Sequence, residues 1–144
     1  VLTAVGMAVA FISAFLFGRL IDKKAGGILL KYGVIAKSAG HIMRPLTGNM
    51  IGAAGINIGS EVATTSYSMA FTRGMFDVAD YSGFRLTYLL LIEIAVNLGA
   101  ALAAGIAALL LWLFEPRYAF TLFFIVTALY VLIIASPRFS LYKR

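Results

Sequence analysis

Cysteine and charged residues are what this chain lacks most. It has no cysteine, so disulfides, thiolate catalysis and cysteine-ligated zinc are excluded within this sequence. Charged residues make up 12% of its 144 positions, against roughly 25% in an ordinary soluble domain. So few charges cannot cover the surface of a soluble domain of this size. With 62% hydrophobic residues and a mean hydropathy of +0.96, the composition is that of a membrane protein.

The residue sets of common enzymes are also missing. The sequence contains neither H-E-x-x-H nor G-x-S-x-G, and Ser60 beside Glu61 has no histidine positioned by sequence to act as its base. His41 is the only histidine and a weak metal candidate, because metal sites combine several ligands; a structural role is the alternative. We therefore predict no catalytic residue, no metal site, no cofactor and no enzyme.

The positive net charge does not indicate nucleic-acid binding. The chain carries a net charge of +6, but its twelve Lys and Arg occur singly or in pairs beside apolar runs. Nucleic-acid-binding proteins gather such residues on one face. We predict a lipid bilayer, not nucleic acid, as the partner of this surface.

The apolar runs predict an all-α, polytopic transmembrane bundle that forms a single domain over residues 1–144. A hydrocarbon core of about 30 Å needs about 20 apolar helical residues. Five spans are expected: 1–21, 25–46, 49–71, 86–114 and 118–136, followed by a cytoplasmic tail, 137–144. The stretch TRGMFDVADYSGFR should connect the third and fourth spans as a long loop or a short interfacial helix. The opening residues have neither Met nor a basic region, so we expect a missing N-terminal part rather than a signal peptide.

The second span is the least apolar of the five. It contains Lys31, Lys37, His41 and Arg44, and each central basic residue costs about 2.5 to 3.5 kcal/mol on insertion scales. Such a helix needs neighbouring helices, water or anionic partners. The alternative is an amphipathic helix on the membrane surface or a re-entrant segment.

The distribution of basic residues supports five spans and orients them. With five spans, one side of the membrane receives nine Lys and Arg: Arg19, Lys23, Lys24, Lys31, Arg73, Arg85, Arg138, Lys143 and Arg144. Arg44 and Arg117 fall on the other side. Cytoplasmic loops are enriched in Lys and Arg, so the C-terminus is predicted to be cytoplasmic and the chain to reside in the plasma or inner membrane.

Small residues recur at four-residue spacing and predict close helix packing. The first span has Gly6, Ala10, Ala14 and Gly18; the third has Gly48 and Gly52, then Gly55 and Gly59; the fourth has Ala95, Gly99 and Ala103. Small side chains allow helix backbones to approach in lipid. Chance recurrence in a chain rich in Ala and Gly is the alternative.

Ionisable residues at membrane depth are the candidates for function, because a charge in the bilayer is costly. Lys37, His41 and Arg44 share one helical face, and Glu61 and Glu93 are the acids deep enough to meet them. Asn97 lies one turn from Glu93. The candidates for substrate binding or coupling are Lys37, His41, Glu61, Glu93 and Asn97. A structural ion pair or hydrogen bond between helices remains the alternative reading.

Residues 18–27, GRLIDKKAGG, resemble the cytoplasmic signature of the major facilitator superfamily. Gly18, Leu20, Asp22 and Lys23 match its pattern, whereas Ala25 replaces its second glycine and Gly26 and Gly27 replace its basic pair. The stretch FRLTYLLLIEIAVNLGAAL is similar to the eleventh helix of some members. The resemblance implies a fold of twelve helices, of which this chain would supply helices eight to twelve, the C-terminal half lacking one helix. The missing N-terminal helices of the same protein would then be partners.

Two functions follow from these patterns. The first is a secondary transporter that carries a small polar or anionic solute by alternating access. Lys37 and His41 would attract the solute, Glu61 or Glu93 would couple protons, and, as the resemblance implies, Gly18, Asp22 and Lys23 would form a cytoplasmic gating motif. The second is a non-transporting membrane scaffold or assembly subunit whose small-residue stripes bind the helices of a partner.

Overall fold

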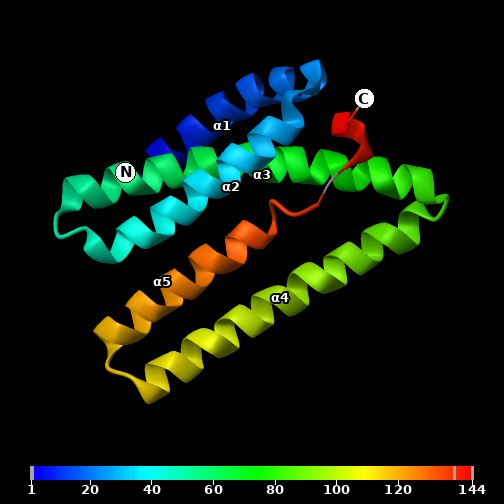
Figure 1. Cartoon of the computed structure of the whole chain (residues 1–144). Helices are drawn as coiled ribbons and strands as arrows, with labels where there is room; N and C mark the ends of the chain where they lie inside the picture. Colours follow the sequence, from blue (N-terminus) through cyan, green and yellow to red (C-terminus); the bar gives the residue numbers. More distant parts are fainter. Residues whose placement is uncertain (1, 138, 144) are drawn as a thin grey trace.

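The computed structural model describes the backbone of residues 2–137 and 139–143 and most side chains; those of residues 2–4, 23, 24, 140 and 143 lie outside the described part. Figure 1 shows an arrangement of helices, with no strand in the described ranges. The elements are α1 (Leu2–Leu20), η1 (Ile21–Ala25), α2 (Gly26–Met43), η2 (Arg44–Leu46), α3 (Met50–Ser82), α4 (Arg85–Leu113), α5 (Pro116–Ile133) and η3 (Ser140–Lys143). The predicted all-α class is confirmed.

Successive α-helices run in opposite directions, so their connections alternate between two ends. The α1–α2 connection, the α3–α4 turn and the C-terminal η3 lie at one end, which we call the η1 end. The connections around η2 and between α4 and α5 lie at the other, the η2 end (Figure 1). Helices α1 and α2 pack on α3, α5 packs on α2, and α4 lies at the outside against α5 and α3.

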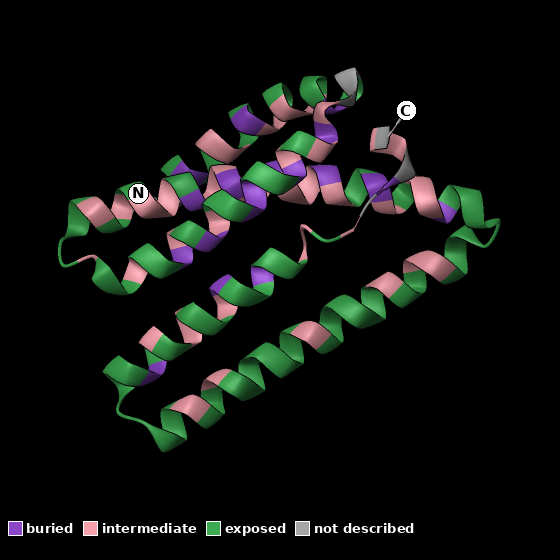
Figure 2. Cartoon of the chain, viewed as in Figure 1, coloured by how far each residue is buried: buried purple, intermediate pink, exposed green. Residues whose placement is uncertain are grey.

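Buried residues concentrate on α2 and α3, as the purple segments of Figure 2 show. In contrast, α4 has no buried residue along its 29 positions. Most of its leucines are exposed and therefore face an environment other than this chain. A helix that is apolar all round and unburied is typical of a lipid-facing or partner-facing segment.

Two helices, α4 and α5, are long and apolar enough to cross a membrane. Helix α1 contains a shorter apolar stretch, Val5–Leu20. Helices α2 and α3 contain charged and polar residues, which make them less apolar than α4 and α5, and they are not among the candidates. The structure thus supports an all-helical protein with two candidate membrane helices, and five spans remain a prediction.

Helix α3 differs from the sequence expectation. A span over 49–71 followed by a loop was predicted, but one helix continues from Met50 to Ser82. It begins where the Asn49 side chain accepts a hydrogen bond of 2.6 Å from the Gly52 amide, and it ends at Gly83, whose φ of 74° a side chain would disfavour. At 1.5 Å per residue, these 33 residues extend about 50 Å, so α3 exceeds the hydrocarbon thickness.

The charged segment between α1 and α2 also has an unexpected local structure. The expected spans leave residues 22–24 as a connection, yet the backbone stays helical through it: Ile21–Ala25 form a π-helical turn, and Gly26 and Gly27 begin α2. Gly26 is required by packing rather than by backbone conformation: a Cβ there would overlap the Tyr142 ring. Its φ and ψ are right-handed helical.

The C-terminal segment, expected to be a tail, packs against the η1 end within the described residues. The Tyr142 hydroxyl donates a hydrogen bond of 2.6 Å to the Ala70 carbonyl. Phe139 is buried, meets Phe71 edge to face with ring centroids 5.6 Å apart, and fills the space beside Gly74. Together with Ile21 and Leu30, these residues form the core cluster of this end.

Candidate functional site at the interface of α2 and α3

The interface of α2 and α3 is the most extensive helix contact in the described part of the chain. A Cβ at Gly33 would stand 2.9 Å from the Tyr67 backbone nitrogen, and one at Gly40 would stand 3.9 Å from Ser60. These two contacts fix an antiparallel register. The buried residues that α3 contributes are all small: Ser60, Ala63, Ser66, Ala70, Gly74 and Ala79. Small residues bring the backbones together and place the longer polar side chains at the edges of the contact.

Lys37 and Ser60 form the central polar contact of this interface. The Lys37 ammonium donates a hydrogen bond of 2.7 Å to the Ser60 hydroxyl, and Ser60 is 3% exposed. Glu61, the next residue on α3, is near enough to act electrostatically on Lys37. Among the described residues, however, the one ion pair within 4 Å joins Arg85 and Asp80. Lys37 therefore bonds a neutral oxygen and keeps its charge uncompensated by direct pairing.

Arg44 repeats this pattern near the η2 end. Its guanidinium donates a hydrogen bond of 3.2 Å to the Asn57 side-chain oxygen, again a neutral acceptor. Both residues line a cavity of about 310 Å³ together with Thr47, Met50, Ala53, Ala54 and Ile56. The guanidinium also lies 5.6 Å from the centroid of the Phe124 ring of α5.

His41 lies between the two cations on α2 but faces α5. It is 8% exposed, and its ring is stacked with Phe124, with centroids 6.1 Å apart. Its Nδ1 has no hydrogen-bond partner in the described residues. One turn away, the Ser38 hydroxyl donates to the Ala128 carbonyl of α5 at 3.0 Å. Lys37 therefore meets α3, His41 meets α5, and Arg44, at the start of η2, meets both.

Glu61 is partly buried between α1 and α2. Its Cγ would lie 3.6 Å from a Cβ at Gly6, so the acid packs against the small-residue face of α1. Gly18, further along that face, is near Met69 of α3. The stripe on α1 does form a helix contact, whereas Gly55 and Gly59 on α3 meet no atom within 4 Å.

Glu93 and Asn97 do not join this cluster. Both are exposed, and the Asn97 amide donates to the Glu93 carboxylate at 3.1 Å and to its carbonyl at 2.9 Å. At 100° per residue, they lie opposite Ala95 and Gly99, which face α3 across a cavity. The expected approach of Glu93 to the basic face of α2 therefore does not occur in this fold.

The gating motif suggested by the resemblance lies at the η1 end. Gly18 contacts α3, and Asp22 is exposed in the π-helical turn. The side chain of Lys23 lies outside the described residues.

Sequence reasoning missed three partners of the basic residues: Asn57, Ser60 and Phe124. The first two had a readable signal, since Asn57, Ser60 and Glu61 recur at three- to four-residue spacing and predict a polar face on α3. Phe124 had no such signal in the sequence, because a phenylalanine in an apolar span gives no indication of which helix it contacts.

No family model, curated protein or solved structure matches this chain. In the described residues, no group of three or more His, Cys, Asp or Glu side chains could hold a metal ion. The function must accordingly be argued from the polar interface itself.

Proposed function

We propose that the chain is part of a secondary membrane transporter of the major facilitator type, which moves a small polar or anionic solute by alternating access. The observation that carries this proposal is the hydrogen bond from Lys37 to Ser60, with Glu61 in electrostatic range, near the middle of the predicted spans 25–46 and 49–71. An ionisable group at such depth is costly and is typically retained for function. Transporters place substrate sites near the midplane of the bilayer.

The charge balance of the interface favours an anionic solute. Lys37 and Arg44 both bond neutral side-chain oxygens, so their positive charges remain available to a ligand. A carboxylate or phosphate bound between α2 and α3 would replace Ser60 and Asn57 as the acceptor. It would be the stronger acceptor, because it is charged and they are neutral. The existing bonds to neutral oxygens thereby keep the two cations in position without neutralising them.

Glu61 is the better of the two acids for proton coupling. It lies close to Lys37, whereas Glu93 faces away from the polar interface and bonds Asn97. Protonation of Glu61 would change the charge around Lys37, and a solute anion would respond to that change. Asp22 and the rest of the gating motif would act at the η1 end, which is cytoplasmic in the predicted orientation.

A flux assay on the complete transporter, this chain together with the N-terminal helices that the proposal requires, tests this proposal. The protein is reconstituted in liposomes that contain a pH-sensitive dye, and a panel of small carboxylates and phosphate esters is added outside. We expect at least one anion to acidify the interior, and Lys37→Met to reduce that flux about tenfold or more through loss of the charge-assisted bond. Lys31→Met is the matched control, since Lys31 is exposed on the same helix.

Equal loss of flux and of folded protein in Lys37→Met would make Lys37 a structural brace. An absence of flux with every anion in the wild-type liposomes would contradict the proposal.

The scaffold function is favoured by a separate observation. Helix α4 buries no residue and exposes Glu93 and Asn97 on its outer face, as expected for a helix that a partner covers. Single cysteines at positions 37, 41 and 61 distinguish the two functions, because the natural chain has no cysteine to interfere. Membrane-impermeant thiol reagents should reach these positions in a transporter and should fail to reach them in a scaffold whose partner is bound.

A further inference from the structure

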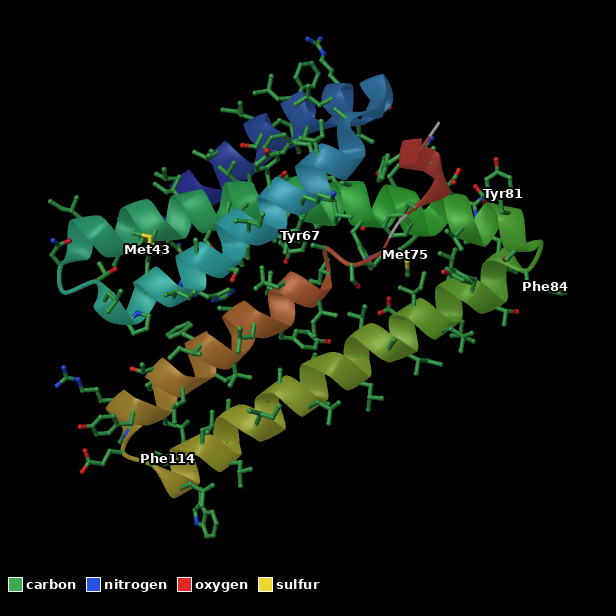
Figure 3. All side chains as sticks on the ribbon, in the orientation of Figure 1. Met43, Tyr67, Met75, Tyr81, Phe84 and Phe114 are labelled. Carbon is green, nitrogen blue, oxygen red and sulfur yellow. The ribbon has the colours of Figure 1, made fainter. Side chains whose placement is uncertain are left out.

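A second cavity lies between α3, α4 and α5 and plays no part in the proposed transport site. Its volume is about 640 Å³, within the range of about 300–1,000 Å³ typical of ligand pockets. Tyr67 and Met75 line it from α3, Ala95 and Gly99 from α4, and Tyr130 from α5. Figure 3 shows Tyr67 and Met75 on the side of α3 that faces these two helices. The walls are mostly apolar, so the cavity suits a hydrocarbon ligand.

A smaller cavity of about 340 Å³ adjoins this one and ends at a cationic group. Both cavities are lined by Ser68 and Thr72, and the smaller one adds Arg73 and Phe76. Arg73 is exposed, and Arg85, at the start of α4, lies over the Phe76 ring at 5.9 Å. The apolar chamber therefore leads to a site lined by Arg73, whereas the nearby Arg85 is paired with Asp80 at 3.3 Å.

An apolar cavity that adjoins a cationic site matches one class of molecule. The two helices that enclose the larger cavity with α3 are those long and apolar enough to cross a membrane, and in a bilayer acyl chains would surround it. The apolar span predicted for α3 ends at residue 71, which places Arg73 near the water boundary, where lipid phosphates lie. Basic residues at this depth attract anionic headgroups.

We infer that an anionic phospholipid binds here, with one acyl chain between α3, α4 and α5 and its phosphate beside Arg73. This site requires only that α4 and α5 lie in a bilayer, so it does not depend on transport. Helix α4 has no buried residue because a space separates it from its neighbours. The bound lipid fills this space and connects α4 to the rest of the bundle.

Counting retained lipids tests the inference directly. The full chain is reconstituted in vesicles of equimolar phosphatidylglycerol and phosphatidylcholine, extracted in mild detergent and weighed by native mass spectrometry. We expect one phosphatidylglycerol to remain on the wild-type chain in preference to phosphatidylcholine.

Two glycines on α4 provide a matched pair of variants. No atom lies within 4 Å of a Cβ at Gly99 or at Gly105, so leucine is accommodated at both positions, but only Gly99 lines the cavity. Gly99→Leu should lower the retained lipid about tenfold, as expected from displacing about two buried methylene groups, and Gly105→Leu should leave it unchanged. Helical circular dichroism of both variants verifies that the fold persists.

Charge variants test the headgroup site. Arg73→Gln should remove the preference for phosphatidylglycerol, whereas Arg117→Gln, an exposed arginine at the η2 end, should keep it. The inference is overturned if the wild type retains no lipid, or if the two glycine variants retain it equally. It is also overturned if Gly99→Leu instead disperses a dimer, which would make a second copy of the chain the occupant.

Discussion

The Lys37 ammonium donates a hydrogen bond of 2.7 Å to the hydroxyl of Ser60, a residue 23 positions further along the chain. This bond joins the middle of α2 to α3 through a cation and a neutral acceptor. Because Ser60 is buried, water cannot readily take its place when it is removed. The consequences for stability, transport and pH dependence can each be measured.

Ser60→Ala should destabilise the fold by about 1–3 kcal/mol, the cost of leaving a partly buried donor without its acceptor. Lys37→Met removes the charge itself, so the double variant Lys37→Met/Ser60→Ala should recover most of the loss. Thermal unfolding in detergent measures all three. If the losses in the two single variants simply add in the double variant, the two side chains are not energetically coupled.

Gly33→Ala should weaken the α2–α3 contact by about 1–3 kcal/mol, because the new methyl would meet the Tyr67 backbone at 2.9 Å. Gly59→Ala is the control: its Cβ would lie in open space, and the better helix propensity of alanine should add up to about 1 kcal/mol. The unfolding midpoints of the two variants should shift in opposite directions. A shift of the same sign and size in both would argue against the close approach at Gly33.

Glu61→Gln should abolish proton coupling, whereas Glu93→Gln should leave it intact. The reason is position: Glu61 acts on Lys37, and Glu93 lies on the opposite side of α4 from the cavity and bonds Asn97. Proton flux and solute flux are measured separately in the liposome assay. Loss of coupling in Glu93→Gln alone would reverse the assignment of the two acids.

Tyr142 should titrate above the ordinary tyrosine value of 10.0, because burial at the η1 end raises the pKa of its hydroxyl. A raised pKa favours the protonated form, so the folded state keeps this proton up to a higher pH than the unfolded state does. The stability from docking Tyr142 is therefore fully present below pH 10.0 and decreases as the pH rises through the folded pKa.

The ultraviolet titration of the wild type minus that of Tyr142→Phe isolates this one tyrosine. Tyr142→Phe also removes the hydrogen bond to the Ala70 carbonyl, so it should be less stable by about 0.5–1.5 kcal/mol at neutral pH. A difference curve with its midpoint at or below the ordinary value would contradict the buried position of the hydroxyl.

Most of the helices could be predicted from hydropathy. The expected spans 1–21, 86–114 and 118–136 correspond closely to α1, α4 and α5, because their apolar runs are bounded by charges or proline. The end of α3 could not be predicted in this way. Polarity after residue 71 suggested a loop, yet a helix needs only satisfied backbone bonds and continues until Gly83.

The site was predicted only in part for a related reason. Helical periodicity placed Lys37, His41 and Arg44 on one face; Lys37 and His41 lie on α2, and Arg44 begins η2 directly after it. Periodicity cannot say which helix each side chain meets. In the structure Lys37 bonds Ser60, Arg44 bonds Asn57, and His41 and Arg44 both meet the Phe124 ring.

The sequence by itself determined an all-helical, apolar chain and the charged residues that lie within its apolar segments. Composition and periodicity are local properties, and they suffice for both conclusions. Tertiary structure alone decided that Glu61 approaches Lys37, that Glu93 turns away, and that Tyr142 packs on Gly26. These relations depend on which small residues allow two helix backbones to approach. The helices that approach each other are far apart in the chain, so local sequence does not specify the contact.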